Sequence, residues 1–139
     1  MTRTDVSAYA RGSDWSAVHA VVAGVGVAGF AAADQLIHLG ARVTVIDAAD
    51  GDKQRERAEI LDVIGASVRL GDGDTLPDGA DVLVVSPGLP PRSPVILAAQ
   101  EQGVPVWGEL ELAWRLRGPD AAPWLVVTGT NGKTTTTLM

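Results

Sequence analysis

The sequence predicts an α/β fold in which a doubly wound, mostly parallel sheet carries helices on both faces. Two observations support this prediction. Short apolar runs rich in valine alternate along the chain with longer segments whose apolar residues recur at helical spacing. The apolar runs also lack a polar side, which is typical of strands buried on both faces of a parallel sheet.

The elements follow one another in a regular order. Strands are expected within residues 17–29, 41–47, 67–70, 80–88, 104–107 and 124–129, and helices within 30–40, 52–65, 93–103 and 108–118. Gly40 and Gly65 each end a helix, because glycine accepts the left-handed conformation that follows a last helical turn. Ser93 and Pro94 begin the third helix as its N-cap and its first helical residue.

The chain divides into four parts. Residues 1–15 are polar and aperiodic, which predicts a flexible leader. Residues 16–117 hold the alternating strands and helices of one domain. Residues 118–123 contain two prolines and read as a linker. Residues 124–139 begin a second domain with a strand and a glycine-containing loop.

Composition narrows the function classes. The chain has 139 residues, of which 46% are hydrophobic and 20% charged, as is typical of a globular protein with its own core. A net charge of −6 argues against broad contact with nucleic acid or an anionic membrane surface. The absence of cysteine excludes disulfides and cysteine-based zinc sites, and it is compatible with the cytoplasm. No apolar run reaches the length of a membrane span.

A first glycine loop joins the first strand to the first helix. Gly24, Gly26 and Gly29 give the pattern G-x-G-x-x-G, and Asp47 ends the second strand near the position of a ribose-binding acid. Such a loop allows a tight turn, lets phosphate approach the backbone and presents the N-terminus of a helix to an anion. This arrangement predicts a Rossmann-like nucleotide site. The alternative is that the glycines serve close packing alone.

A second glycine loop, TGTNGKTTT, follows the last expected strand and predicts a nucleoside triphosphate site. It departs from the common phosphate loop because Val127 stands where the first glycine is usual. Lys133 is expected to neutralise the β- and γ-phosphates, and Thr134 or Thr135 to reach Mg²⁺ through its hydroxyl. The expected phosphate-binding residues are Gly129, Thr130, Asn131, Gly132, Lys133, Thr134 and Thr135.

The second loop, VVTGTNGKTTTT, resembles the ATP loop of the Mur ligases and of their folylpolyglutamate synthase relatives. Four further stretches narrow the resemblance: VVAGVGVAG, VTVID, VVSPGLPPRSP and VPVWGELELAWRL. They occur in this order in the UDP-N-acetylmuramoyl-L-alanine:D-glutamate ligases of the Mur family. The resemblance covers about residues 16–139, which is nearly the whole chain.

The resemblance implies a reaction of cytoplasmic peptidoglycan synthesis. In that family, ATP with Mg²⁺ phosphorylates the L-alanyl carboxylate of UDP-N-acetylmuramoyl-L-alanine, and the amine of D-glutamate attacks the acyl phosphate. Lys133 and Thr134 would act on the transferred phosphate. Neither nucleic acid nor a membrane is an expected partner.

The resemblance also assigns the first glycine loop to the uridine diphosphate of that substrate. Gly24, Gly26, Val27, Ala28 and Gly29 would line the diphosphate and uracil, and Asp47 would hydrogen-bond the uridine. Many relatives carry a hydroxyl or basic residue after this acid, whereas Ala48 and Ala49 follow it here.

A Ser-Pro-Gly turn ends the fourth strand at the edge of the sheet where doubly wound folds bind ligands. Ser86 and the N–H of Gly88, separated by Pro87, are expected to meet the diphosphate or the sugar. A rigid turn without ligand contact is the alternative. Glu109 and Glu111, two residues apart on a helix, do not share a face and are expected to be structural.

Compared with the family, the chain looks like a first domain with the opening strand and loop of a second. We therefore expect a polypeptide that binds the UDP end of the substrate and has no ligase activity alone. Three alternatives stay open: an NAD-binding domain of an oxidoreductase, a different Mur ligase such as the L-alanine-adding enzyme, and a separate UDP-sugar-binding module.

Overall fold

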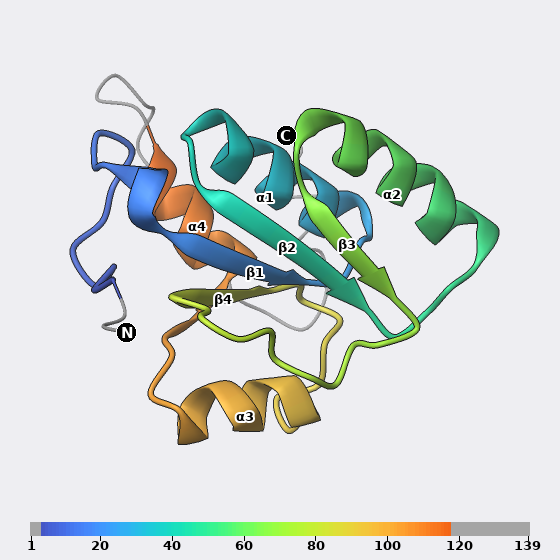
Figure 1. The fold of residues 1–139 in the computed structure, drawn as a ribbon. Coiled ribbons are helices and arrows are strands. Elements are labelled where there is room, and N and C mark those ends of the chain that lie inside the picture. Colours follow the sequence, from blue (N-terminus) through green and yellow to red (C-terminus); the bar gives the residue numbers. More distant parts are fainter. Residues whose placement is uncertain (1–3, 118–139) are drawn as a thin grey trace, which may run out of the picture.

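The computed structural model describes residues 4–117, which form a five-stranded parallel sheet with helices on both faces (Figure 1). The strands are β1 (His19–Ala23), β2 (Arg42–Asp47), β3 (Ser67–Leu70), β4 (Val82–Val85) and β5 (Val106–Gly108). The helices are the short 3₁₀ turn η1 (Trp15–Ala17), α1 (Val27–His38), α2 (Asp52–Ile64), α3 (Pro94–Glu101) and α4 (Glu109–Leu116). The strand order is β3-β2-β1-β4-β5, so the predicted α/β fold is confirmed.

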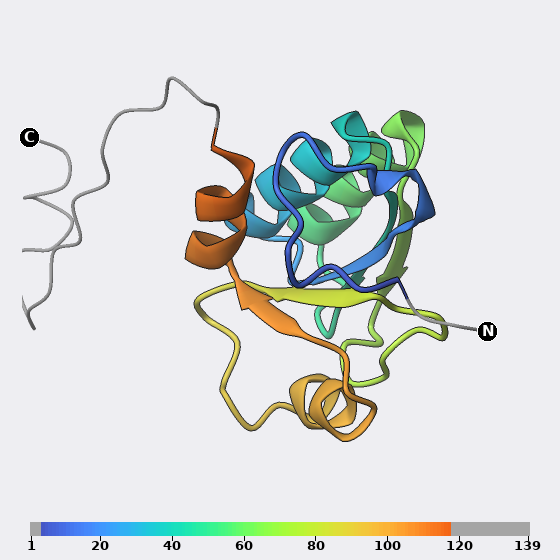
Figure 2. The same ribbon diagram turned by 90° about the vertical axis from the view of Figure 1, so that its left-hand side faces the viewer.

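The helices lie on both faces of the sheet, as predicted, but in unequal numbers. Figures 1 and 2 show α1, α2 and α4 over one face and α3 over the other. Along β1 the side chains alternate, so that Ala20 and Val22 enter the core under the three helices and Val21 and Ala23 enter the core under α3. Both cores are purely apolar at these positions, which explains why the strands have no polar side.

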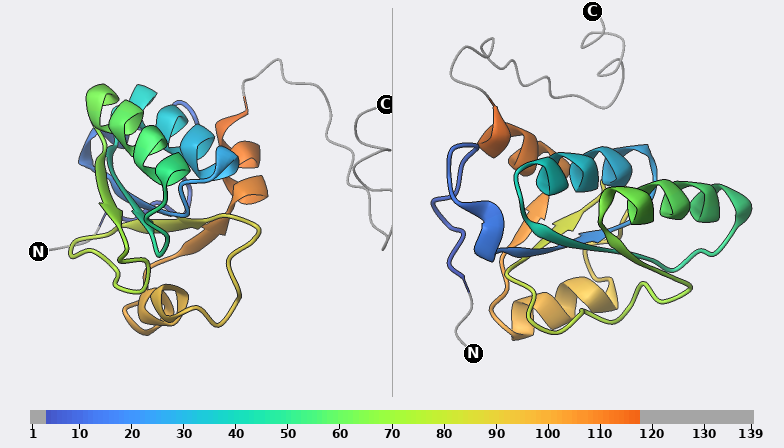
Figure 3. Two further views of the ribbon diagram at one scale, coloured as in Figure 1. Left: turned by 90° about the vertical axis from the view of Figure 1, so that its right-hand side faces the viewer. Right: turned by 45° about the horizontal axis from the view of Figure 1, so that its top comes forward.

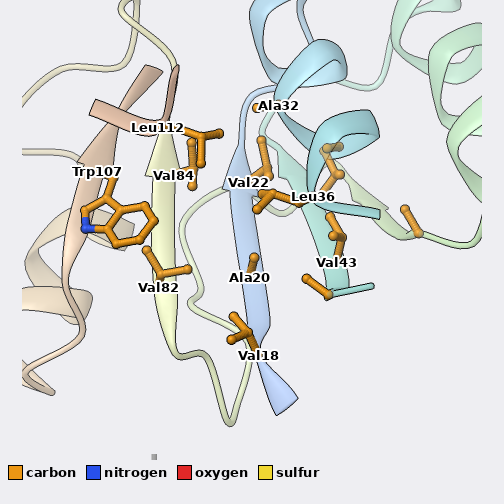
Figure 4. Packing of buried hydrophobic residues seen from close by; sticks show 14 of the residues in the cluster. Val18, Ala20, Val22, Ala32, Leu36, Val43, Val82, Val84, Trp107 and Leu112 are labelled. Carbon is orange, nitrogen blue, oxygen red and sulfur yellow. The ribbon is translucent and has the colours of Figure 1, made fainter. Parts of the chain in front are cut away.

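The larger core is built mostly from valine, leucine and alanine side chains, together with the indoles of Trp15 and Trp107. Figure 4 shows Val22 of β1 between Leu36 of α1 and Val84 of β4, with Trp107 of β5 at the far side. Val22 and Leu36 have no exposed surface. Burying such side chains contributes about 1.5–3 kcal/mol each relative to exposure, and this burial is what holds α1 against the sheet.

The predicted helix ends are confirmed. Gly65 follows α2 with φ of 113°, and Gly40 follows α1 with φ of 96°, both in the left-handed region that favours glycine. Ser93 is the N-cap of α3 and Pro94 its first residue. Ser93 does not cap through its side chain, because its hydroxyl instead donates to the carbonyl of Pro90 at 2.7 Å.

The N-terminal segment, residues 4–14, differs from the flexible leader that the sequence predicts. Figure 3 shows this segment running alongside α4. The N–H of Thr4 donates to Oδ1 of Asp81 at 2.8 Å, and the side chain of Val6 is 1% exposed. Arg115 of α4 donates to the carbonyls of Ser7 and Tyr9 at 2.9 and 3.2 Å. These contacts bind the segment to the larger core.

Three aromatic rings continue that packing. Trp15 is 1% exposed, and its ring meets Tyr9 and Trp107 edge to face, with centroids 5.1 and 6.4 Å away. Its indole N–H donates to the carbonyl of Ala10 at 3.0 Å. The guanidinium of Arg115 lies over the Trp107 ring, 4.1 Å from its centroid. The N-terminal segment, η1, β5 and α4 therefore share one aromatic cluster.

A small polar cluster is buried at the amino ends of the strands. Oδ2 of Asp81 accepts from the backbone N–H of His19 at 2.7 Å, and the His19 Nε2 lies 2.8 Å from the hydroxyl of Thr44. The His19 Nδ1 has no hydrogen-bond partner among the described residues. Burial lowers the pKa of the His19 imidazole, and the nearby positive charge of Arg42 acts in the same direction. The folded protein therefore favours the neutral ring.

His19 is expected to make the stability depend on pH. Because its pKa is lowered on folding, the unfolded chain binds a proton more readily, and stability rises with pH through that window. The stabilisation is complete above the unfolded value of about 6.5 and is lost as the pH falls through the folded value. Urea unfolding at several values between about pH 7.5 and pH 5 should show this decline.

The substitution His19→Gln should flatten the pH dependence in that window. The matched control is His38→Gln, because His38 is largely exposed on α1, and this variant should keep the wild-type profile. A His19→Gln profile as steep as that of the wild type would assign the decline to other groups.

Candidate functional site

The candidate site lies at the carboxyl edge of the sheet. All five strands are parallel, so the loops that follow β1, β2 and β4 leave from the same edge. These loops carry the first glycine loop, Asp47 and the Ser-Pro-Gly turn. The topology thus places three stretches that the sequence predicts to contact a ligand at the same edge of the sheet.

The first glycine loop needs its glycines for two different reasons. Gly24 has φ of 105°, a left-handed conformation that other residues rarely adopt. A Cβ added to Gly29 would lie 1.7 Å from the carbonyl oxygen of Gly24, so the start of α1 packs directly on the loop backbone. A Cβ on Gly26 would meet nothing within 4 Å. The space beside Gly26 is therefore open.

The N-terminus of α1 presents unpaired backbone donors at this opening. The first hydrogen bond of the helix runs from the N–H of Phe30 to the carbonyl of Gly26 at 2.9 Å, so the N–H groups of residues 27–29 have no acceptor within the helix. Gly26 offers no side-chain cap, and no acidic residue lies in the first turn. Val27 is 76% exposed. The geometry and dipole at this point favour a bound anion.

Asp47 holds the glycine loop from the neighbouring strand. Its Oδ2 accepts from the N–H of Val25 at 2.9 Å, and its Oδ1 accepts from the N–H of Ala49 at 2.8 Å. A carboxylate has about four acceptor positions, so these bonds leave capacity for a ligand hydroxyl. Its contact with uridine stays a prediction, while its contact with the loop is a feature that the sequence pattern did not predict.

The Ser-Pro-Gly turn reaches the same loop from the other side. A Cβ added to Gly24 would lie 2.7 Å from the Oγ of Ser86, so the Ser86 hydroxyl sits over the glycine loop. The N–H of Leu89 donates to the carbonyl of Ser86 at 3.1 Å, which closes a tight turn around Pro87 and Gly88. The turn is therefore closed by a backbone hydrogen bond and also lies beside the glycine loop. Its contact with a ligand stays a prediction.

Three cavities lined by residues 4–117 border this region. The largest, about 730 Å³, lies between β4, β5, α3 and α4, and its lining includes Ser86, Pro87, Gln100 and Glu109. A second of about 310 Å³ lies between α1 and α4, lined in part by Ala28 and Glu109. A third of about 430 Å³ lies between α1 and α2, lined by Val27, Phe30, Lys53, Glu56, Arg57 and Ile60.

The sequence predicts a structural role for Glu109 at the start of α4. It is exposed, it lies in the first helical turn, and it lines two of these cavities. Glu111 instead accepts from Nε of Arg115 at 3.0 Å on the same helix. The two carboxylates therefore have separate surroundings.

Ala48 and Ala49, which follow Asp47, are exposed, but the backbone of Ala48 has a close neighbour. A Cβ on Gly73 would lie 2.5 Å from the backbone N of Ala48, so the turn after β3 lies against this residue. Arg55 of α2 pairs with Asp50 at 2.9 Å, and its neighbour Arg57 reaches the glycine loop. Sequence reasoning missed Gly73 and Arg57. The only local signals were that Gly73 stands in a turn and that Arg57 stands among polar residues of a helix.

The predicted ATP-loop residues all lie outside the described part of the chain. They are Gly129, Thr130, Asn131, Gly132, Lys133, Thr134 and Thr135. The expected linker and second domain lie there too. Within residues 4–117, no three His, Asp or Glu side chains come together in a way that could hold a metal ion. The helices of this part of the chain lack the length and the apolar run that a membrane span requires.

Comparison with known families decides the assignment. The model of the Mur ligase MurD-like N-terminal domain matches residues 18–108, which include all five strands. The chain belongs to this family. The resemblance drawn from the glycine loops and the stretches between them is thereby confirmed, and an NAD-dependent oxidoreductase is not favoured.

Similar curated proteins of this family carry one name, UDP-N-acetylmuramoylalanine--D-glutamate ligase. The protein from Streptomyces avermitilis is 54% identical over 127 residues, which cover 91% of this chain and 27% of the relative. The protein from Streptomyces coelicolor is 54% identical over 130 residues, covering 91% of this chain and 28% of the relative. The chain thus spans about a quarter of the length of these relatives.

Among solved structures, the Cu(II) complex of the HOCl-induced flavoprotein disulfide reductase RclA from Escherichia coli matches 58% of this chain and 23% of its own. Its TM-score is 0.40 and its sequence identity 20%, a likeness too low to carry an argument.

Proposed function

We propose that this family member binds the uridine diphosphate end of UDP-N-acetylmuramoyl-L-alanine. One observation carries the proposal: Asp47 and Ser86, from two different strand ends, both meet the first glycine loop where α1 begins. The diphosphate would lie against the N–H of Gly26 and the N–H groups of residues 27–29, which have no acceptor within the helix. The uridine would extend toward Asp47, and the sugar toward Ser86 and the largest cavity.

The same proposal places this domain in an ATP-dependent ligase of cytoplasmic peptidoglycan synthesis. The names of the similar proteins support D-glutamate as the second substrate. ATP with Mg²⁺ would activate the substrate carboxylate as an acyl phosphate, and the amine of D-glutamate would displace the phosphate to form the amide. Lys133, Thr134 and Thr135 would hold the ATP phosphates and Mg²⁺.

The domain's part in this reaction is to fix one end of the substrate. A diphosphate held by several backbone donors has little freedom to move, and this restricts where the distant L-alanyl carboxylate can lie. Such alignment lowers the barrier of a reaction between bound groups without any chemistry at the binding site itself.

Calorimetric titration of the 139-residue protein tests the proposal. The ligands are UDP-N-acetylmuramoyl-L-alanine, UDP and NADH, each titrated under the same conditions. We expect heat of binding for both uridine ligands and none for NADH. Binding of NADH without any response to UDP would indicate that the glycine loop binds a dinucleotide, and it would overturn the proposal.

A further inference from the structure

Val25, in the middle of the first glycine loop, is held on both sides of its backbone. Its N–H donates to Oδ2 of Asp47 at 2.9 Å, and its carbonyl accepts from Nη1 of Arg57 at 3.4 Å. Its side chain has no exposed surface. Asp47 ends β2 and Arg57 lies in α2, so residues from two neighbouring elements hydrogen-bond to the backbone of one loop residue.

These two contacts fix two successive peptide planes. A peptide unit is planar, so the carbonyl of Val25 and the N–H of Gly26 lie in one plane and point in opposite directions. A guanidinium that holds the Val25 carbonyl therefore decides where the Gly26 N–H points. Asp47 does the same for the preceding plane, whose carbonyl belongs to Gly24 and faces the start of α1.

Few atoms pack against Gly26, so packing around this residue does not by itself orient its N–H. No atom lies within 4 Å of the position of its missing Cβ, and its φ of −68° is one that many residues adopt. Gly26 itself therefore does little to fix the orientation of this peptide unit. The contacts of Val25 with Asp47 and Arg57 restrain it instead.

Arg57 is available for this task, whereas the other arginine of α2 is not. Arg55 is paired with Asp50 through Nε at 2.9 Å and Nη2 at 3.3 Å. Among residues 4–117 no carboxylate is paired with Arg57, which is half-buried and lines the 430 Å³ cavity beside Val27. Its positive charge lies beside the N-terminus of α1 without being neutralised by an ion pair.

We propose that Arg57 is a positioning residue of the diphosphate site, which aligns the Gly26 N–H through the Val25 carbonyl. The proposal rests on the proposed function, because it names the residue that prepares the loop for the diphosphate. Arg57 supplies this positive charge from α2. The residues that directly follow β2, Ala48 and Ala49, carry no charge.

The test compares Arg57→Met and Arg57→Lys with the matched control Arg55→Met. UDP should bind Arg57→Met roughly tenfold more weakly than the wild type, because a charge-assisted hydrogen bond that orients the loop is lost. Uridine, which lacks phosphates, should bind both proteins equally. Arg57→Lys keeps one charged donor and should recover most of the UDP affinity, and Arg55→Met should match the wild type.

A second measurement separates positioning from stability. In the ligand-free protein, the amide resonance of Gly26 should shift in Arg57→Met, while those of Gly40 and Gly65 stay in place. A role of Arg57 that does not act through the Val25 carbonyl would lower the melting temperature and leave the Gly26 resonance of the folded protein unchanged.

The outcomes are distinct. Equal weakening of UDP and uridine, or an unchanged Gly26 resonance, overturns the assignment of Arg57. Absence of UDP binding in the wild type overturns the proposed function instead, and the Gly26 resonance then still tests whether Arg57 orients the loop.

Discussion

Replacing Gly29 with alanine is expected to destabilise the domain by about 3 kcal/mol and to remove UDP binding. The added Cβ would lie 1.7 Å from the carbonyl oxygen of Gly24 and 2.8 Å from its carbonyl carbon. These are backbone atoms, so no side chain can rotate away. Either α1 moves off the sheet or the loop that would hold the diphosphate is displaced.

Urea unfolding followed by circular dichroism measures the loss of stability, and calorimetry with UDP measures the loss of binding. Gly12→Ala is the matched control, because a Cβ at Gly12 meets nothing within 4 Å and this residue lies outside the site. The control should stay within about 0.5 kcal/mol of the wild type. A Gly29→Ala protein that folds and binds UDP normally would show that α1 does not need this close approach.

The same glycine illustrates what the sequence could predict. The pattern formed by Gly24, Gly26 and Gly29 lies between a strand and a helix, and each position has a local reason that a reader of the chain can state. The order of strands and helices was predictable for a similar reason. Valine-rich runs and helical spacing are local patterns, and a parallel sheet follows from their alternation.

The packing of the N-terminal segment was not predictable in this way. Val6 and Tyr9 stand among polar residues and alanines, and no period of a helix or strand joins them. Their burial depends on Arg115, more than 100 residues away along the chain. A local pattern carries no information about such a contact, so a polar, aperiodic stretch predicts a leader.

Arg57 was missed for a related reason. The sequence of α2 shows that Arg55 and Arg57 both stand among polar residues in the first half of the helix. Which one reaches the glycine loop depends on the rotation of α2 about its axis, and packing sets this rotation. Leu61, which has no exposed surface, faces the core and determines which side of the helix faces α1.

Trp15→Ala is expected to destabilise the protein by about 3–5 kcal/mol, as for the loss of a large buried aromatic side chain. Trp15 is 1% exposed and meets Tyr9 and Trp107 edge to face. Removing it leaves a cavity and also deprives the carbonyl of Ala10 of its donor. Urea unfolding followed by circular dichroism avoids the change in fluorescence that the substitution itself causes.

The comparison with Trp114→Ala separates burial from the mere loss of an indole. Trp114 is 44% exposed on α4, so its removal should destabilise the protein by about 1 kcal/mol or less. If Trp15 joins the N-terminal segment to the sheet, hydrogen exchange at Tyr9, whose N–H donates to the carbonyl of Val6 at 2.9 Å, should quicken in Trp15→Ala and stay slow in Trp114→Ala. Equal losses of stability in the two variants would mean that the segment adds nothing to the fold. A much larger loss for Trp15 would make residues 4–14 part of the domain that positions α4 and, through it, the cavity beside Ser86.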